Sequence, residues 1–282
     1  MEHYDILIIG GGAAGIAAAK ACGNARVLLA DRKKTLGGVL PQCAHRGFGD
    51  RKNGPEYVAR LLKGFPPTVT LALNTTVLSV SRDKTALLCG AAFGRREVAF
   101  DQLILATGCR EIPMGALPIA GTRPKGIYTA GQMQELMNLH GFTPEGPAVI
   151  LGSGDLGLIM ARHLAEKGIP VTLVEQRQQC GGMAKNRRCL QEYPIQLICA
   201  DTVAEVRGDP RLTGCITVKG RELPCKILLI AAGLRPEREL VAHLESPEWL
   251  HICGNCNRVH PMVEGVVQEG TQAGVSALRN LR

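Results

Sequence analysis

Short apolar runs alternate with glycine turns and helix-forming segments in the first thirty residues. The run Ile6–Ile9 has the length of a buried parallel strand. Three glycines follow it, and then an Ala-rich segment of high helix propensity. Val27–Ala30 is a second short apolar run. The order strand, glycine turn, helix, strand predicts one βαβ unit of a parallel sheet in an α/β protein.

The same order recurs in the middle of the chain. Ala148–Leu151 is an apolar run followed by glycines, Leu158–Lys167 has a helical pattern, and Val171–Val174 is the next strand. Each unit also has a later apolar strand that runs into a small-residue turn, at residues 103–108 and 228–233. Two such units in one chain predict two α/β domains of the same type.

The remaining patterns are weaker. Helices are expected from Pro55 through Leu62, over residues 131–139, and from about Val263 to Leu278. Prolines between residues 113 and 124 indicate a linker. A period of two predicts short strands, the last three of which could form a meander, at residues 68–73, 75–80, 85–88 and 96–100. A separate buried strand is expected at residues 102–106.

Composition places the chain among ordinary globular proteins. Apolar residues make up 45% of the 282 residues, and the net charge is +8 without a long basic run. Aromatic residues are only 4%, too few for a base-stacking nucleic-acid surface. No apolar run reaches the roughly 18 residues of a membrane span, and the N-terminus lacks the basic region of a signal peptide. We expect a soluble, cytoplasmic protein whose eleven cysteines are mostly reduced.

The first glycine turn has the chemistry of a phosphate site. Gly10, Gly12 and Gly15 have the spacing G-x-G-x-x-G. In this spacing the first glycine permits a tight turn, the second lets a pyrophosphate approach the backbone, and the third lets the helix pack on the strand. The N–H groups and positive dipole end of the following helix would face the pyrophosphate. Asp31 ends the second strand, where it can accept a hydrogen bond from a ribose hydroxyl. We therefore expect a dinucleotide here.

The second glycine turn has the same spacing, at Gly152, Gly154 and Gly157. Glu175 takes the place of the acid at the end of the next strand. An acid there suits a ribose 2′-hydroxyl and repels a 2′-phosphate, which favours NAD over NADP. Arg177, two residues later, weakens that preference. Asp155 is interpreted as a cap at the helix N-terminus rather than as a catalytic group.

Taken in order, these motifs resemble those of the pyridine nucleotide–disulfide oxidoreductase superfamily. The resemblance covers nearly the whole chain and rests on Gly10-x-Gly12-x-x-Gly15 with Asp31, Gly37-Gly38, Ala106-Thr107-Gly108, Gly152-x-Gly154-x-x-Gly157 with Glu175, Ala231–Pro236 and Cys253-Gly254-Asn255. Residues 37–43 and 151–162 are closer to one branch. That branch contains the small FAD/NAD(P)-binding partner subunits of glycerol-3-phosphate or proline dehydrogenase-like and opine oxidase-like complexes.

The resemblance implies two Rossmann-like domains with different nucleotides. It implies a discontinuous FAD-binding domain, residues 1–118 and 237–282 with a β-meander insert, and an inserted NAD(P)-binding domain, residues 119–236. It places at FAD the residues Gly10, Gly12, Ala14, Gly15, Asp31, Arg32, Gly38, Val77, Ala106, Thr107, Gly108, Gly254 and Asn255. It places at the nicotinamide nucleotide the residues Gly152, Gly154, Asp155, Leu156, Gly157, Glu175 and Gly233. Asn255 stands where the family usually has Asp, so its contact with the ribityl chain would be uncharged.

The cysteine pattern departs from that of the disulfide reductases in the superfamily. Those enzymes carry a Cys-x4-Cys pair just after the Gly-Gly motif, or a Cys-x-x-Cys pair in the nicotinamide domain. Here Cys43 is the single cysteine just after the Gly-Gly motif, and the nicotinamide domain has no Cys-x-x-Cys pair. This pattern disfavours disulfide reduction. Cys43 and His45 are weak candidates for tuning or protonating the flavin. The alternative is a core thiol and a solvated imidazole.

The motif Cys253-x-x-Cys256 has three interpretations. With His251 and His260 it has a spacing that a zinc knuckle could use, and the two thiols could also form a redox pair. The match of Gly254-Asn255 to the flavin position favours a contact with the flavin. We accordingly predict no metal site.

These observations lead to a functional hypothesis with two rivals. We expect an FAD-dependent oxidoreductase that exchanges hydride between NAD(P)H and the flavin, which itself carries the redox chemistry. It would be the electron-transfer subunit of a multi-subunit dehydrogenase, beside a substrate-oxidising flavoprotein subunit, with an iron–sulfur protein as a further candidate partner and self-association left open. The first rival is a non-catalytic nucleotide-binding subunit. The second is a stand-alone NADH oxidase, or a disulfide or peroxide reductase.

Overall fold

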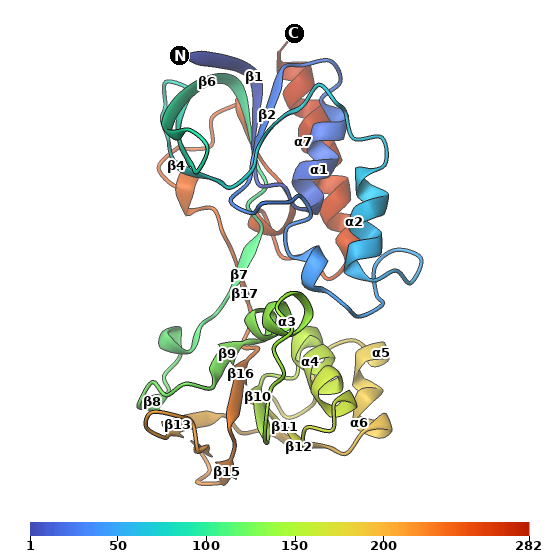
Figure 1. Ribbon diagram of the computed structural model, residues 1–282, viewed down its shortest axis with the longest axis vertical. Helices are drawn as coiled ribbons and strands as arrows, with labels where there is room; N and C mark the ends of the chain where they lie inside the picture. Colours follow the sequence, from blue (N-terminus) through green and yellow to red (C-terminus); the bar gives the residue numbers. More distant parts are fainter. Residues whose placement is uncertain (282) are drawn as a thin grey trace. The chain divides into compact units, whose positions relative to one another are not determined.

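The computed structural model describes residues 1–281. The chain forms two compact units: residues 1–110 with the C-terminal segment from Arg235 onward, and residues 111–234 (Figure 1). It crosses between the units twice, in strands β7 (Cys109–Glu111) and β17 (Leu234–Pro236), which pair with each other. Each unit is built on a largely parallel sheet flanked by helices, which confirms the predicted α/β fold.

The first unit is built on a seven-stranded sheet. Its order is β3-β2-β1-β6-β5-β4, with β18 alongside β6. Strands β3, β2, β1 and β18 run parallel to the end of β6, whereas β4, β5 and the start of β6 form the predicted antiparallel meander. The bounds are β1 (Glu2–Ile9), β2 (Val27–Ala30), β3 (Thr70–Ala72), β4 (Thr75–Val80), β5 (Thr85–Gly90), β6 (Gly94–Leu105) and β18 (Leu250–Ile252).

Strand β6 corrects one expectation from the sequence. Residues 96–100 and 102–106 were expected as two strands, but Gly94–Leu105 is one strand of 12 residues. Its first half pairs antiparallel with β5, and residues 98–105 pair parallel with β1. The polar residues Asp101 and Gln102 interrupt the hydrophobic pattern without breaking the strand, because β1 pairs with β6 on both sides of this interruption.

Helices α1 (Ala13–Ala21) and α7 (Val263–Asn280) cross at close range in the first unit. A Cβ atom added to Gly270 would overlap the carbonyl oxygen of Ala14, and one on Gly274 would overlap that of Ala18. Glycines are therefore required for the two backbones to meet. Figure 1 shows α7, from the far end of the sequence, lying beside α1. The other elements of this unit are α2 (Gly54–Leu62) and the 3₁₀ turns η1 (Leu40–Gln42), η3 (Glu239–Val241) and η4 (Gly254–Cys256).

The second unit repeats the parallel architecture. Its five-stranded sheet has the order β12-β11-β10-β16-β9, and a four-stranded sheet has the order β15-β14-β13-β8. The strands are β8 (Ala120–Gly121), β9 (Ile127–Thr129), β10 (Ala148–Leu151), β11 (Val171–Glu175), β12 (Ile195–Cys199), β13 (Val203–Arg207), β14 (Gly214–Thr217), β15 (Glu222–Pro224) and β16 (Ile227–Ile230). The helices are α3 (Ala130–Leu139), α4 (Asp155–Glu166), α5 (Ala184–Arg187) and α6 (Cys189–Glu192), with the 3₁₀ turn η2 (Met114–Ala116).

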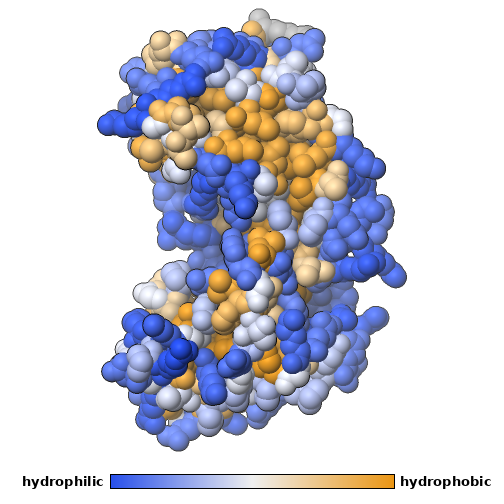
Figure 2. Space-filling view, in the orientation of Figure 1, coloured by the Kyte–Doolittle hydropathy of each residue, from blue (hydrophilic) through white to orange (hydrophobic). Residues whose placement is uncertain are grey.

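Strands β2, β10 and β16 are buried along their whole length, as parallel strands covered on both faces are. Figure 2 shows apolar side chains reaching the surface of each unit between polar margins, with the larger area on the face where α1 lies. Among the helices of residues 1–281, none combines the length and the apolar character needed to cross a bilayer.

Candidate functional site

The first glycine turn joins β1 to α1 under tight packing constraints. Gly10 has φ +107°, and a Cβ atom there would overlap the carbonyl oxygen of Ala106 at the end of β6. A Cβ atom on Gly15 would overlap the carbonyl oxygen of Gly10. Because backbone fills the space at both positions, these two glycines are required by the turn itself, whatever binds beside it.

Gly12 is different, because it borders open space. It is the N-cap residue of α1, with no side-chain cap, and α1 has no acidic residue in its first turn. The nearest atom to a Cβ atom on Gly12 would be the Cα atom of Gly38, 3.9 Å away. Gly38 has φ +60° and faces back toward Gly12. The N-terminal amides of α1 and the Gly37-Gly38 segment thus form the two sides of a cradle suited to an anion.

Asp31 lies at the edge of this cradle and is 9% exposed. Its Oδ2 accepts a hydrogen bond from the N–H of Gly11 at 2.5 Å, and its Oδ1 accepts one from the N–H of Lys33 at 2.6 Å. Each oxygen keeps a further lone pair, since a carboxylate has about four acceptor sites. The carboxylate is held rigidly beside the loop and can still accept from a ribose hydroxyl.

The turn after β6 is also fixed beside this cradle. The Ala106 N–H donates to Ile9 O at 2.8 Å, which places the turn next to the end of β1. The Thr107 hydroxyl donates to the carbonyl oxygen of Glu237, and the Glu237 N–H donates to Gly108 O at 2.9 Å. The carboxylate of Glu237 lies 3.6 Å from the exposed guanidinium of Arg32. Glu237, which the sequence did not single out, therefore connects three of the predicted residues.

The loop that carries Gly254 and Asn255 is held by one carboxylate of α7. Glu269 accepts hydrogen bonds from the Gly254 N–H at 2.9 Å and from the Asn257 amide at 3.4 Å. Its carboxylate also lies 3.0 Å from Nε2 of His260, whose backbone N–H donates to Asn255 Oδ1 at 3.0 Å. Burial alone would raise the pKa of Glu269, but these donors outweigh it and hold the pKa below its ordinary value.

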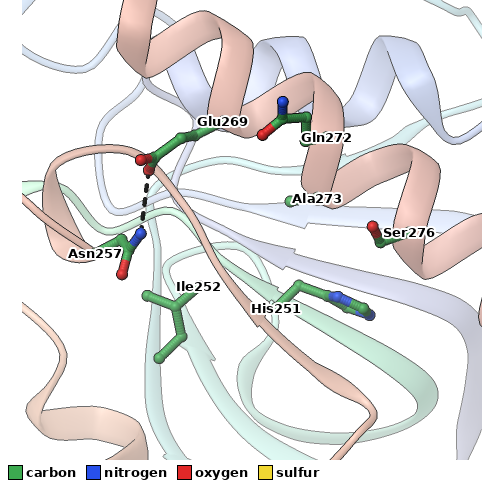
Figure 3. A pocket seen from close by; sticks show the side chains of 7 residues that line it. All are labelled: His251, Ile252, Asn257, Glu269, Gln272, Ala273 and Ser276. Carbon is green, nitrogen blue, oxygen red and sulfur yellow. Dashed lines mark hydrogen bonds between the residues drawn. The ribbon is translucent and has the colours of Figure 1, made fainter.

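A polar cavity of about 280 Å³ lies between β18 and α7 (Figure 3). Its walls are His251, Ile252, Asn257, Glu269, Gln272, Ala273 and Ser276. Burial, and then the charge of Arg279, hold the pKa of His251 below its ordinary value, so this imidazole is neutral at pH 7. None of the seven residues is among those predicted to bind FAD. The cavity contributes to the site only through Glu269, which supports the Gly254 loop from this side.

Ala14 and Val77 are two further residues predicted to bind FAD. Ala14 is buried against the Gly254 loop, since a Cβ atom on Gly254 would be 2.8 Å from the Ala14 Cβ atom. Val77 is half-buried on β4, next to an irregularity in its pairing with β5. Ala14 thus packs the C-terminal loop onto α1, and the side chain of Val77 packs on the core of the unit.

The second glycine turn, between β10 and α4, repeats the constraints of the first. A Cβ atom on Gly152, with φ +105°, would overlap the carbonyl oxygen of Ala231, and one on Gly157 would overlap that of Gly152. Gly154 is the N-cap of α4, and a Cβ atom there would meet nothing within 4 Å. The middle glycine again borders open space, as Gly12 does.

Glu175 is buried beside this turn and has three donors. Its Oε2 accepts from the N–H of Ser153 at 2.9 Å and from the Ser153 hydroxyl at 2.5 Å, and its Oε1 accepts from the N–H of Arg177 at 2.9 Å. Burial would raise the pKa of Glu175, but the hydrogen bond from the Ser153 hydroxyl and the backbone donors hold it below its ordinary value. Glu175 is therefore a fixed negative charge at pH 7.

Asp155 and Leu156 begin α4, and Gly233 follows β16. Asp155 Oδ1 accepts from the Met183 N–H at 2.7 Å and from the Asn186 amide at 2.6 Å, so this carboxylate ties a loop to the helix. Leu156 packs on the core of the unit. Gly233 has φ +129°, and its carbonyl accepts from the N–H of Ile112 at 3.1 Å. Of the three, Asp155 alone directs a polar side chain toward its neighbours at the turn.

Cys43 is a poor nucleophile in this structure. It is buried, and burial raises its pKa to about 12 against a small opposing effect of Lys33. Its Sγ lies 3.4 Å from the carbonyl oxygen of Val39. The ring of His45 packs at 5.0 Å from that of Phe48. The environment is that of a core thiol, so activation as a thiolate is disfavoured.

Cys253 and Cys256 are also buried core thiols. Both Sγ atoms are within donor range of Leu105 O, at 3.7 Å and 3.2 Å, and burial raises the pKa of Cys253. His251 is 3.0 Å from the Gln102 side-chain oxygen instead of converging with the thiols. Among residues 1–281, the one His/Cys/Asp/Glu group close enough to share an ion is the partly exposed trio His3, Asp5 and Asp101. A zinc knuckle at the Cys-x-x-Cys motif is therefore disfavoured.

Three polar residues that the sequence analysis missed hold the two cradles: Glu237, Glu269 and Ser153. Ser153 could have been found, because it occupies the same position in the second turn as Gly11 does in the first. No local pattern identifies Glu237, whose partners are distant in the sequence, or Glu269, whose partners Gly254, Asn257 and His260 lie 9 to 15 positions before it.

Comparisons with known proteins agree with this geometry. A family model for pyridine nucleotide-disulphide oxidoreductases matches residues 4–249. An opine oxidase subunit of Rhizobium meliloti is 33% identical over 274 residues, covering 85% of this chain and 52% of the relative. The corresponding opine oxidase subunit of Agrobacterium tumefaciens is 34% identical over 199 residues, covering 63% of this chain and 38% of the relative. The chain thus spans about half the length, or less, of these relatives.

A solved structure matches the fold over its whole length. The thioredoxin reductase of Lactococcus lactis superposes with a TM-score of 0.79, covering 99% of both chains at 20% identity. A likeness at this identity shows the fold, with two units of the same kind, and says nothing of the substrate.

Proposed function

The chain belongs to the pyridine nucleotide-disulphide oxidoreductase family, and we propose that it exchanges hydride between NAD(P)H and a bound FAD. The observation that carries the proposal is the pair of matched cradles. Each has a strand, a glycine turn with an open middle glycine, a helix N-terminus and an acid bonded to the loop. Two such cradles in one chain suit two nucleotides.

The residues of the first unit fit FAD. The open space at Gly12 suits a pyrophosphate, and Asp31 can accept from the adenosine ribose. Asn255 uses its Oδ1 for the His260 N–H, which leaves its amide N–H₂ to donate to a ribityl hydroxyl. When bound, FAD would take up hydride from the nicotinamide and pass on its electrons. The side chains supply binding and orientation.

The residues of the second unit fit a nicotinamide nucleotide, with NAD preferred. Gly154 leaves the N-terminal amides of α4 open to a pyrophosphate. The charged carboxylate of Glu175 suits a ribose hydroxyl and repels a 2′-phosphate. No side-chain nucleophile is needed for hydride transfer, and the buried state of Cys43 agrees with that.

We further propose that the chain works beside a second subunit. The relatives it matches over most of its length are named as subunits, and the chain covers only part of them. An adjacent cysteine pair would be needed for disulfide reduction, and the thiols near the first cradle, Cys43 and Cys253, have raised pKa values. A flavoprotein subunit that oxidises an organic substrate is the proposed partner.

The test is an anaerobic titration of the FAD-loaded protein with NADH. We expect loss of the flavin's visible absorbance band, with one NADH consumed for each flavin, because hydride transfer carries two electrons. Tight binding of NADH without loss of absorbance would contradict the proposal and favour a structural nucleotide-binding subunit. Sustained turnover with oxygen or peroxide alone would favour a stand-alone oxidase or peroxide reductase.

A further inference from the structure

The two halves share a feature beyond the glycine turn and the acid. A Gly-Gly pair follows each acid after the same interval: Gly37-Gly38 after Asp31, and Gly181-Gly182 after Glu175. The N–H of Gly37 donates to the carbonyl oxygen of Gly11 at 2.8 Å, which presses the first pair onto its glycine turn. The second pair, Gly181-Gly182, also lies against its own glycine turn, but there a side chain accepts the hydrogen bond instead of a backbone carbonyl.

That side chain is Ser153. The N–H of Gly181 donates to the Ser153 hydroxyl oxygen at 2.8 Å, while this hydroxyl donates to Glu175 Oε2 at 2.5 Å. Ser153 is completely buried. One hydroxyl therefore joins the glycine turn, the acid and the glycine pair, and its donor and acceptor functions are both used.

A second tie holds the same segment. Asp155, in the first turn of α4, accepts from the Met183 N–H and from the Asn186 amide. A Cβ atom on Gly182 would be 3.1 Å from Asp155 Oδ1 and 3.2 Å from its backbone nitrogen. Residues 181–186 are thus fixed beside the N-terminus of α4 at two points, and the first of these, Ser153, also binds the carboxylate of Glu175, the last residue of β11.

Fixing Glu175 has a consequence for nucleotide choice. A carboxylate that could swing aside would let a 2′-phosphate enter and pair with a nearby cation. Arg177 is such a cation, since its charge acts on Glu175. The Ser153 hydroxyl and N–H both donate to Oε2, and the Arg177 N–H donates to Oε1, so both oxygens of the acid are held in place. The choice between a ribose 2′-hydroxyl and a 2′-phosphate therefore depends on Ser153, a residue that would not itself contact the nucleotide.

We propose that Ser153 is a positioning residue that makes the second site select a nucleotide with a free 2′-hydroxyl, by locking Glu175 and the Gly181-Gly182 segment together. This inference rests on the proposed function, because it assumes that the second unit binds the nicotinamide nucleotide.

The test is Ser153→Ala in the FAD-loaded protein. Dissociation constants for NADH and NADPH are measured by isothermal titration calorimetry. We expect NADH binding to weaken about tenfold, because the Ser153 hydroxyl no longer holds the carboxylate of Glu175 in place for the ribose hydroxyl. NADPH binding should stay equal or tighten, so the preference for NADH falls at least tenfold, and the FAD content should not change.

A pH series adds a readout that a merely structural role would not change. Removing the hydroxyl donor takes away one cause of the lowered pKa of Glu175, so the acid protonates at a higher pH. NADH affinity of Ser153→Ala should therefore decline earlier on acidification than that of the wild type. Thr213→Val, which removes an exposed hydroxyl bonded to Arg207 O in the same unit, is the matched control.

The possible outcomes separate the two proposals. If the wild type binds neither nucleotide at the second unit, the proposed function fails. If the wild type binds NADH and Ser153→Ala keeps the wild-type preference over NADPH, the role of Ser153 is refuted and the function stands. Should Ser153→Ala fold poorly, Ser153→Gly copies the first turn and must show the same loss of preference, and a preserved preference there refutes the inference.

Discussion

The two glycine turns are matched in backbone and differ in how their surroundings hold them. In both, the first and last glycines are required by backbone contacts, and the middle glycine borders open space. In both, one carboxylate oxygen accepts from the second residue of the turn and the other accepts two residues beyond the acid. The repeated part is the part proposed to face a pyrophosphate and a ribose. What differs is the support behind it.

The second residue of each turn shows the difference most clearly. A Cβ atom on Gly11 would be 2.5 Å from Leu36 Cδ2 and 3.1 Å from Asp31 Oδ2, so a side chain there would force Leu36 to move. In the second turn this position is Ser153, and the residue that corresponds to Leu36 is Cys180, which is smaller. Each turn therefore fills the same space differently, with a large apolar side chain in one and a bonded hydroxyl in the other.

The first turn has an additional support from the C-terminus. Glu269 on α7 fixes the Gly254 loop, and α7 lies on α1 through Gly270 and Gly274. In the second unit the turn is held by residues within about thirty positions of it in the sequence, Ser153, Asp155 and the 181–186 segment. The first turn is thus supported by contacts from the distant C-terminal helix, and the second by contacts nearer in the sequence.

The largest effect is expected from filling the two open positions one at a time. Gly12→Val should abolish FAD binding and leave NADH binding to the second unit measurable, whereas Gly154→Val should do the reverse. Both residues have extended backbone that Val can adopt, so the loss is steric exclusion of pyrophosphate and not misfolding. We expect the affinity of each site for its nucleotide to fall at least about 100-fold, or by about 3 kcal/mol of binding free energy. Flavin absorbance per protein and calorimetric titration measure the two sites separately.

The crossed design contains its own control. Each variant is the reference for the other, because the change is the same and only the turn differs. Full retention of FAD by Gly12→Val, or loss of FAD in Gly154→Val, would contradict the assignment of the two nucleotides to the two units.

A smaller effect is expected from exchanging the supports behind the first turn. Gly11→Ser should destabilise the first unit by about 1–3 kcal/mol, since the new Cβ atom overpacks against Leu36. Leu36→Cys should cost about 2 kcal/mol through the space that it leaves. The double variant has the pair found in the second turn, so the two costs should offset each other by about 1 kcal/mol or more. Urea unfolding of all four proteins gives this coupling, and strict additivity would show that the two positions do not share the space.

Sequence reasoning succeeded where the chemistry is local and repeated. The apolar runs, the glycine spacing and the acids could be read from the chain, because each strand is a local apolar run and each acid lies within about twenty-five residues of its glycine turn. It was wrong about β6, where Asp101 and Gln102 interrupt the apolar pattern inside a continuous strand. It could not find Glu269 or Glu237, whose partners are set by the tertiary packing of α7 and of the return from the second unit. The ligand contacts assigned by resemblance stay predictions.

The smallest expected effect concerns the long-range support of the first turn and depends on pH. The lowered pKa of Glu269 means that the folded state holds its carboxylate ionised more firmly than the unfolded chain does. Its contribution to stability is present above the ordinary glutamate pKa of about 4.3 and is lost as the pH falls from there through the lower folded value. Wild type should therefore lose more stability between pH 7 and pH 3 than Glu269→Gln, by about 1 kcal/mol. The single tryptophan, Trp249, packs on Phe100 in the first unit, so its fluorescence during urea unfolding reports that unit.

Glu264→Gln, the same change elsewhere on α7, is the control. Equal acid sensitivity of Glu269→Gln and wild type would show that the Gly254 loop is held without this carboxylate, and would remove the contrast between long-range and local support.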